Sequence, residues 1–406
     1  MLTKDTLVEI AAKQRKNILN TVKLIPRELI RQINIDTNHA VIISGIRRCG
    51  KSTLLNVLMQ RFKACNYFNF EDPRLSEFKV HDFEKLTLAL KELNGSEVYF
   101  FDEIQNVPQW ETYIRSLLDQ KKKVFLTGSN ASLLSRELGT KLTGRNLRYE
   151  LYPFSFTEYC LFKEKKPDHN VFLDYFNKGG FPEYIRYNEQ KILQDIYLDI
   201  LYRDIISRHK LKNEKSLKEV ANFLISNAGK EFSYNSLKKI FSLGTATTPI
   251  NYVSYLEDSY LLFVISKFDF SLKKQAVNPK KAYVIDNALG DTVASKFTKD
   301  QGRMLENIVF LELKKRHETV FYFKRKGECD FITKDKNAVS AVYQVCYELT
   351  PDNLDRELGG LIEAVKETKV KTFLILTMNQ EDWFEKDGLK IKALPVWKWL
   401  LDGKKS

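Results

Sequence analysis

The stretch that most limits the fold of this 406-residue chain runs from Ala40 to Phe62. Its apolar start, Ala40–Ile43, predicts a buried strand. Residues 45–52 then fit the spacing G-x-x-x-x-G-K-S, and a helical pattern opens at Ser52. In this setting the loop N–H groups and the positive end of the helix dipole both face an anion. The stretch therefore predicts a phosphate-binding P-loop.

Each residue type in the loop has a separate expected task. The Lys51 ammonium would reach the β- and γ-phosphates of a nucleotide, and the Ser52 hydroxyl would bind Mg²⁺. The Cys49 thiol lies beside cations that can lower a thiol pKa, although a tolerated loop position is the simpler interpretation. The residues expected to contact nucleotide are Gly45, Ile46, Arg47, Arg48, Cys49, Gly50, Lys51, Ser52, Thr53 and, from a later strand, Ser129.

A second buried strand, Val98–Phe101, ends in the acidic pair Asp102-Glu103. This is the pattern of a Walker B strand, in which Asp102 would hold the hydrated Mg²⁺ and Glu103 would polarise the attacking water. A solvated strand end or a helix cap is the alternative for an isolated acidic pair. The P-loop upstream favours the catalytic interpretation.

A further strand begins at Val124 and ends in the polar residues Ser129 and Asn130. Either residue could cap a helix over Ala131–Leu138. Helical spacing covers Thr6–Ile33, with a break at Pro26. Because strands alternate with helices, we expect an α/β fold. Its parallel sheet would carry helices on both faces and bind ligands at the carboxyl ends of its strands.

The composition limits the partners and the compartment. The formal net charge of +13 favours a polyanion such as double-stranded DNA, or less often a membrane surface, although charge can also serve solubility alone. No apolar run reaches the length of a membrane span, and no signal-peptide pattern opens the chain. The 5 scattered cysteines suggest a reducing compartment, so we expect a cytoplasmic protein without a membrane partner.

Several short motifs follow one another in an order that resembles a known family. They are GIRRCGKST, FFDEIQ, LTGSN, LTGR, LYPFSFTEY, GGFPE and LYRDI. Together they resemble a prokaryotic family of AAA+/STAND-like P-loop ATPases of mostly unassigned function. The resemblance implies an ATPase domain over residues 1–160, a helical and winged-helix domain over 161–298, and a PD-(D/E)XK nuclease-like domain over 299–406. It also implies ATP and Mg²⁺ as cofactors and a possible homo-oligomer.

The resemblance further assigns roles to residues near the ATPase site. Ser129 or Asn130 stands where AAA+ ATPases carry a polar residue that senses the γ-phosphate. Arg145 is the candidate for the arginine that meets the γ-phosphate, from its own subunit or from a neighbour. Arg136 and Arg148 are rivals for this role, and a surface salt bridge is the alternative.

The middle segment has the pattern of a winged helix. Helices are expected over Glu214–Ala228, Ser233–Phe241 and Thr248–Leu261, and wing strands over Val264–Phe270 and Lys281–Ile285. On this interpretation three residues of the third helix face a DNA groove and four lysines bind phosphates. A lid or protein-docking module is the alternative, because the third helix carries no basic residue. The residues concerned are Asn251, Tyr252 and Tyr255, and Lys238, Lys239, Lys273 and Lys274.

The nuclease-like domain departs from the pattern of its family. Glu306 and Asp330 match the acidic positions, but the third strand reads Gln344-Val-Cys346 where an E-x-K motif is required. The neutral Gln344 amide cannot supply the negative charge that a carboxylate ligand gives to a metal ion. The Cys346 thiol cannot replace the lysine that activates water. We therefore expect a degenerate site and a domain kept for binding or scaffolding. Glu348, Lys334 or Lys366 could compensate for these losses, although their spacing does not require it.

These observations predict an Mg-ATP-binding ATPase that hydrolyses ATP and couples it to DNA. The first alternative is an ATP-controlled switch that binds a protein partner. The second is an ATP-gated nuclease.

Overall fold

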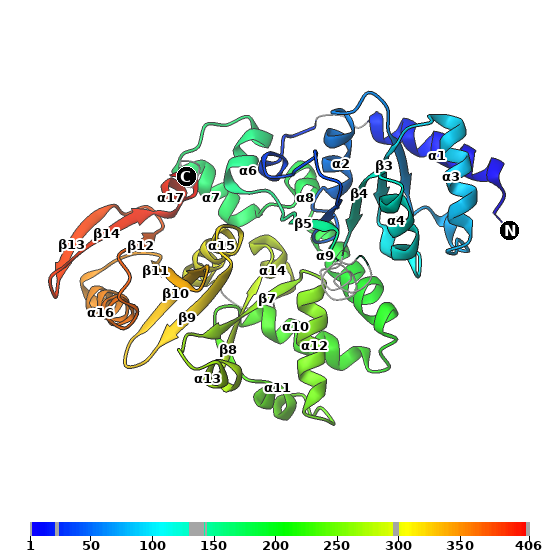
Figure 1. Ribbon diagram of the computed structural model, residues 1–406. Helices are drawn as coiled ribbons and strands as arrows, with labels where there is room; N and C mark the ends of the chain where they lie inside the picture. The colour runs from blue at the N-terminus through cyan, green and yellow to red at the C-terminus, as the bar shows by residue number, and fades with distance from the viewer. Residues whose placement is uncertain (1, 21–23, 130–141, 143, 295–299, 403–406) are drawn as a thin grey trace. The chain divides into compact units, whose positions relative to one another are not determined.

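The computed structural model describes residues 2–20, 24–129, 142, 144–294 and 300–402, which form two compact units (Figure 1). The first unit comprises Met1–Pro153 together with Asp258–Tyr260. The second comprises Phe154–Glu257 and Leu261–Ser406.

The first unit contains a five-stranded sheet in the order β2-β3-β4-β1-β5, and every neighbouring pair is parallel. This is the parallel sheet that the alternation of strands and helices predicted. The predicted P-loop follows β1, and the acidic pair lies where β3 ends. Both therefore lie at the carboxyl edge of the sheet. The strands are β1 (Ala40–Ser44), β2 (Asn66–Asn69), β3 (Val98–Asp102), β4 (Lys123–Gly128) and β5 (Asn146–Glu150).

Helices cover both faces of this sheet. They are α1 (Lys4–Leu19), α2 (Lys51–Met59), α3 (Asp82–Leu93) and α4 (Trp110–Asp119), with short 3-10 turns at η1 (Glu28–Arg31), η2 (Pro73–Leu75) and η3 (Ile104–Asn106). The expected helix after Pro26 was wrong, because only η1 forms there. Arg27 just before it has an extended backbone, and its buried side chain is directed to the P-loop.

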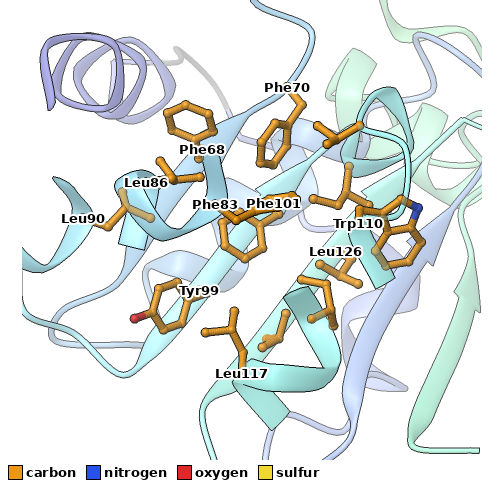
Figure 2. Packing of buried hydrophobic residues seen from close by; sticks show 14 of the residues in the cluster. Phe68, Phe70, Phe83, Leu86, Leu90, Tyr99, Phe101, Trp110, Leu117 and Leu126 are labelled. Atoms are coloured by element: carbon orange, nitrogen blue, oxygen red, sulfur yellow. The ribbon is translucent and has the colours of Figure 1, made fainter. Parts of the chain in front are cut away.

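The core of the first unit is rich in aromatic residues, as Figure 2 shows. Phe68, Tyr99 and Phe101 come from neighbouring strands and pack against residues of α3 and α4. Alternate strand residues point to opposite faces, so Phe100 and Phe125 stack on the other face, with ring centroids 4.5 Å apart. Because both faces are apolar, the strands have the continuous hydrophobic runs seen in the sequence.

The second unit is built on a nine-stranded mixed sheet in the order β13-β14-β12-β11-β10-β9-β7-β8-β6. Its strands are β6 (Glu231–Phe232), β7 (Leu262–Lys267), β8 (Lys280–Val284), β9 (Thr319–Lys324), β10 (Glu328–Asp335), β11 (Ala338–Cys346), β12 (Phe373–Thr377), β13 (Asp382–Lys386) and β14 (Leu389–Pro395).

The helices that precede or follow these strands include the ones expected for the winged-helix proposal, at α10, α11 and α12. The full set is α6 (Phe156–Lys163), α7 (His169–Lys178), α8 (Pro182–Tyr187), α9 (Gln190–Asp199), the π-helical η4 (Ile200–Ser207), α10 (Glu214–Ser226), α11 (Tyr234–Ile240), α12 (Thr247–Asp258), α13 (Leu272–Val277), α14 (Asn287–Val293), α15 (Gln301–Arg316), α16 (Pro351–Thr368) and α17 (Val396–Asp402). The winged-helix assignment itself stays a proposal.

The expected boundary between residues 298 and 299 does not separate compact units. Strand β7, from the expected winged helix, pairs in parallel with β9 of the expected nuclease-like domain, with Ser266 opposite Phe321. One sheet therefore runs through both segments, and they share a single unit. The division of the chain into three domains stays a proposal.

Candidate nucleotide-binding site

The root of the P-loop is tightly enclosed at Gly45. The Gly45 N–H donates to the Gly128 carbonyl at 3.3 Å, and a Cβ at this position would lie 2.1 Å from the Leu151 carbonyl oxygen. No larger residue fits there without moving the backbone of the neighbouring segment. At the other end of the loop, Gly50 has a φ of +101° and leads into α2, a conformation that glycine adopts readily.

Lys51 occupies the centre of the site, and its side chain is only 4% exposed. Its ammonium donates to the carbonyls of Gly45 at 3.1 Å and Ile46 at 3.3 Å, and lies 3.2 Å from Glu103 Oε1. Burial by itself would lower the Lys51 pKa, but Glu103, together with Cys49 and Asp102, outweighs burial and raises the Lys51 pKa. Lys51 is therefore a fixed cation directed into the loop.

Asp102, at the end of β3, is held by hydroxyl groups. Tyr67 donates to its Oδ2 at 3.0 Å, Thr127 donates to its Oδ1, and Ser52 is a third hydrogen-bond partner. Burial, with the neighbouring Glu103, raises the Asp102 pKa. Ser52 and Asp102 thus place two oxygen ligands side by side, and oxygen ligands are what Mg²⁺ prefers. The residues present fit a hydrated Mg²⁺ ion.

Glu103 is oriented by its backbone and by its neighbours. It has a φ of +51°, and its N–H donates to Thr127 Oγ1 at 3.0 Å. The Gln105 amide donates to its carboxylate. Burial would raise the Glu103 pKa, but Lys51 and Gln105 lower it overall, so the group is a carboxylate able to accept a proton from water.

The P-loop also carries two arginines, Arg47 and Arg48. Arg47 pairs with Glu71 at 2.6 Å and helps to lower the Glu103 pKa. Arg48 has a φ of +61°. Near them Ser52 and Tyr67 help to line a cleft of about 790 Å³, whose other lining residues are Lys13, Gln14, Asn17, Ile18, Asn69, Glu71, Asp72, Pro73 and Arg74.

Arg27 supports the P-loop from outside the motif, and the sequence reasoning missed it. Its guanidinium donates to the carbonyls of Cys49 at 2.8 Å and Tyr152 at 2.6 Å. The only signal was a lone arginine after Pro26, which has no defined spacing to the loop. Cys49 is buried and its thiol donates to the Leu151 carbonyl at 3.4 Å. Burial raises the Cys49 pKa, which favours the simpler interpretation of a tolerated loop position over a reactive thiol.

The remaining predicted residues lie at different places. Ser129 is buried at the end of β4, where its hydroxyl accepts from the Gln105 amide at 3.3 Å. Asn130 and Arg136 lie outside the described residues. Arg145 precedes β5 at the amino edge of the sheet, where its carbonyl accepts from Ala40 N–H and its guanidinium pairs with Asp119 at 2.8 Å.

The P-loop lies at the opposite edge, because β1 and β5 run in parallel away from Arg145. Five residues of β1 separate the two edges, about 16 Å along the strand. The structure therefore does not bring Arg145 to the P-loop of its own chain. Arg148, on β5, donates to the Asn146 side chain at 2.9 Å.

The nuclease-like residues form a buried cluster in the second unit. Asp330 accepts from Val345 N–H at 2.8 Å, and burial, followed by the charge of Glu306, raises its pKa well above the usual value. The Gln344 amide donates to Glu357 at 2.6 Å. The Cys346 thiol donates to the Glu348 carbonyl at 3.1 Å.

The cation in this cluster is Lys281 from β8, which the sequence reasoning missed. Its ammonium lies 2.8 Å from Glu328 and 3.6 Å from Glu306, and Tyr283 donates to Glu306 at 2.6 Å. None of the proposed substitutes Glu348, Lys334 or Lys366 takes this position in the contacts described. Among the described residues, no three His, Cys, Asp or Glu side chains are grouped to hold a metal ion.

The residues proposed to read DNA are placed unevenly. Asn251 is exposed, but Tyr252 is buried and donates to the Asn213 carbonyl at 3.4 Å. Tyr255 stacks on His209, with ring centroids 3.8 Å apart. Lys239, Lys273 and Lys274 are exposed, and Lys238 is half-buried. The lysines are available for phosphate contacts, whereas the two tyrosines are engaged within the fold.

In the described part of the chain no helix is long and apolar enough to span a membrane.

Comparison with known proteins identifies two segments and several full-length relatives. Residues 37–160 match a family model described as an AAA domain, and residues 170–300 match a domain of unknown function, DUF8612. An uncharacterised protein of Methanocaldococcus jannaschii is 35% identical over 99% of this chain and 96% of its own length. One of Haemophilus influenzae is 31% identical over 89% of this chain and 94% of its own length.

Solved structures resemble the chain more weakly. The Walker-type ATPase of Pyrococcus abyssi has 15% identity and a TM-score of 0.43, over 68% of this chain and 99% of that one. AMPPCP-bound DnaA from Aquifex aeolicus has 14% identity and a TM-score of 0.28, over 64% of this chain and 92% of that one.

Proposed function

Since the chain belongs to the same family as these M. jannaschii and H. influenzae relatives and its residues 37–160 match an AAA domain, we propose that it binds Mg-ATP and hydrolyses it to ADP and phosphate. The observation that carries the proposal is the grouping of Lys51, Ser52, Asp102 and Glu103 around the P-loop. Three of these side chains are buried and hydrogen-bonded to defined partners, and Ser52 bonds to Asp102.

Bound Mg-ATP supplies the phosphoryl group that is transferred to water. Lys51 neutralises phosphate charge, while Ser52 and Asp102 offer oxygen ligands on the metal side of the loop. Lys51 pairs with Glu103 in this structure, so a nucleotide that draws the ammonium to its phosphates releases the carboxylate. Glu103 then orients water and accepts its proton, with Gln105 holding the carboxylate in place.

The roles of Ser129 and Arg145 follow from their positions. Ser129 lies beside Gln105 and can report on the site through that amide. Arg145 is at the amino edge of the sheet, so we propose that it acts on the nucleotide of a second subunit. That role requires a homo-oligomer. Asn130 remains a second candidate for the sensing role.

The test is steady-state ATP hydrolysis by the full chain, compared with Lys51→Ala and Glu103→Gln. We expect Lys51→Ala to abolish nucleotide binding and turnover. Lys122→Ala is the matched control, because Lys122 pairs with Glu97 at the amino edge of the sheet. Turnover that survives unchanged in Lys51→Ala would count against the assigned site.

For the partner, we propose DNA, contacted through the basic lysines of the second unit. The support is electrostatic: exposed Lys239, Lys273 and Lys274 add to a chain with a net charge of +13. Duplex DNA should then stimulate ATP hydrolysis, and the effect should fade as salt rises. The engaged positions of Tyr252 and Tyr255 favour contact with the DNA backbone over base reading.

A protein partner is the second candidate, and one observation favours it. Phe270, Leu272 and Val277, on and beside the short helix α13, are 73%, 78% and 75% exposed. Exposed apolar side chains grouped on one segment are typical of protein docking sites. ATP hydrolysis that is indifferent to DNA, with an assembly state that changes between ATP and ADP, would favour this candidate.

The ATP-gated nuclease is the third outcome of the same assay. It requires Mg²⁺-dependent cleavage of the added DNA that is lost in Asp330→Ala. Lys281 beside Glu306 supplies the charge that a metal would otherwise provide, so we expect no cleavage.

A further inference from the structure

Asp258–Tyr260 is a short segment with an unusual position in the chain. These residues belong to the first unit, whereas Glu257 before them and Leu261 after them belong to the second. The segment begins at the last residue of α12 and ends shortly before β7. It is therefore joined covalently, at both ends, to chain that folds with the second unit.

Tyr260 is the residue of this segment that reaches the nucleotide site. Its side chain is buried, and its hydroxyl lies 2.7 Å from Ser44 Oγ and 3.2 Å from Glu150 Oε1. The Glu150 carboxylate can only accept, so Tyr260 donates to Glu150 and accepts from Ser44. Tyr152 donates to the other Glu150 oxygen at 2.8 Å. Burial, followed by Glu150, raises the Tyr260 pKa well above its usual value, so the hydroxyl remains a donor.

Ser44 connects this network to the P-loop. It is the last residue of β1 and immediately precedes Gly45, whose carbonyl accepts from Lys51 at 3.1 Å. Its own carbonyl accepts from Leu151 N–H at 2.7 Å. The Tyr260 hydroxyl thus contacts the side chain of Ser44, and the next residue, Gly45, carries the carbonyl that accepts from the Lys51 ammonium. The backbone of Gly45 is close to the Leu151 carbonyl, so the loop root has little room to move independently of Ser44.

The backbone of Tyr260 is in a strained conformation. It has a φ of +60°, a conformation that costs a bulky residue about 1 kcal/mol or more. Glycine or asparagine would adopt it more easily, but neither carries a hydroxyl that could reach Ser44 and Glu150. Strain of this kind persists only where surrounding contacts hold the residue, and here the contacts lead to the P-loop.

We propose that Tyr260 is a positioning residue for the P-loop root, and that it couples nucleotide binding at Lys51 to the conformation of residues 247–267. The inference rests on the proposed binding of Mg-ATP. Because coupling between two sites is reciprocal, any partner that alters residues 247–267 also alters nucleotide affinity. The ATP site and the chain of the second unit then communicate through Ser44 and Tyr260.

Three variants of the full chain test the proposal: Tyr260→Phe, Ser44→Ala and the double variant. Tyr197→Phe is the matched control, since it also removes a buried tyrosine hydroxyl, one that donates to Asn222 in the second unit. Each protein is titrated with a fluorescent ATP analogue in Mg²⁺ and assayed for KM and kcat. Hydrogen exchange over residues 247–267 is compared with and without a non-hydrolysable ATP analogue. Thermal unfolding confirms that each variant folds.

We expect Tyr260→Phe to weaken analogue binding about fivefold or more and to raise KM more than it lowers kcat. The wild type should show slower exchange over 247–267 when the analogue binds, and this protection should be lost in the variant. Ser44→Ala should reproduce both effects, and the double variant should add little, because the two hydroxyls act as one unit. Tyr197→Phe should behave as wild type.

Two results overturn the inference while leaving the proposed ATPase intact. One is analogue binding in both single variants that matches wild type. The other is exchange over 247–267 that ignores the analogue in the wild type. If the wild type binds no nucleotide in the assay that uses Lys51→Ala as reference, the proposed function itself fails. If Tyr260→Phe does not fold, Ser44→Ala decides the question from the P-loop side.

Discussion

At the residue scale, the site contains buried opposite charges in direct contact. Lys51 and Glu103 are an ion pair, and each shifts the pKa of the other towards the charged form. The P-loop spacing and the acidic pair predicted that Lys51 and Glu103 belong to one site. The ion pair between them was not predictable, because it depends on how β3 lies two strands away from β1 in the folded sheet.

Glu103→Gln should separate binding from chemistry. Glutamine keeps the shape and can still accept from Gln105, but it cannot take a proton from water. We expect Mg-ATP affinity within a few fold of wild type and turnover reduced about 10² to 10⁴-fold. Single-turnover hydrolysis and equilibrium titration measure the two quantities. A variant that loses affinity and turnover in parallel would indicate that Glu103 mainly holds the loop together.

Asp72, at the rim of the cleft beside Ser52, gives a prediction about pH. Its hydrogen bonds with Arg74 hold the Asp72 pKa at about 2, against an ordinary value of 3.8. A depressed pKa in the folded state stabilises the protein above the unfolded pKa, and this is lost as the pH falls towards about 2. Because solvent screens this partly exposed pair, the contribution near neutral pH is about 1 kcal/mol.

Urea unfolding of Asp72→Asn and of the wild type measures the contribution of the Asp72 charge. The difference in unfolding free energy between the two proteins should be largest near neutral pH and should decrease as the pH falls from 3.8 towards about 2. A gap that is constant with pH would assign the effect to the shape of the amide and not to charge.

The contacts of Arg27 with the P-loop could not be predicted from the sequence. This residue follows a proline in a stretch that looked helical, and its contacts are with backbone carbonyls of Cys49 and Tyr152. Carbonyls have no sequence signature, so no residue pattern could reveal the pair. The same holds for Lys281, whose carboxylate partners Glu306 and Glu328 come from elements 25 or more residues away.

At the element scale, the strongly patterned elements were predicted and the weakly patterned ones were not. Strands β1, β3 and β4 are continuous apolar runs because both sheet faces are covered. Strand β5 reads Asn-Leu-Arg-Tyr-Glu and was not predicted, because it is an edge strand with little buried surface. Strands β13 and β14 were missed for a similar reason: charged residues alternate along their antiparallel pair.

Helix α16 offers a paired test of close packing at two adjacent glycines. A Cβ at Gly360 would lie 1.9 Å from the Glu328 carbonyl oxygen, whereas a Cβ at Gly359 meets nothing within 4 Å. Gly360→Ala must push α16 away from β10 and should destabilise the protein by about 1 to 3 kcal/mol. Gly359→Ala should stabilise it by up to about 1 kcal/mol, since alanine favours a helix.

Chemical denaturation of the two variants measures this difference. Equal effects at the two positions would mean that the helix and strand can separate at little cost, contrary to the packing described.

At the scale of the whole molecule, the chain divides into two compact units, and the second boundary of the proposed three-domain division lies within the second unit. The family resemblance implied separate winged-helix and nuclease-like domains. Pairing between β7 and β9 joins them into one sheet, and the ion pairs of Lys281 join the same two segments. Neither link is local in sequence, so no composition change or linker could reveal it.

Two units predict two unfolding transitions in scanning calorimetry of the full chain. Mg²⁺ with a non-hydrolysable ATP analogue should raise the transition of the first unit by mass action. Lys281→Met should lower the transition temperature of the second unit, because it removes a buried cation and leaves the Glu306 carboxylate without this partner. The expected loss of unfolding free energy is about 3 to 5 kcal/mol. Lys392→Met, which removes a more exposed lysine paired with Glu381, is the control. A single transition for the wild type would show that the units unfold together.

The pairing of β7 with β9 also sets an order of events during synthesis. Strand β7 ends at Lys267, but its partner begins at Thr319, so some fifty residues must leave the ribosome before the pair can close. In that interval β7 has an open edge with unpaired N–H and carbonyl groups, which is a template for pairing with another chain. A nascent chain stalled near residue 300 therefore still exposes the edge of β7 that β9 covers in the finished protein.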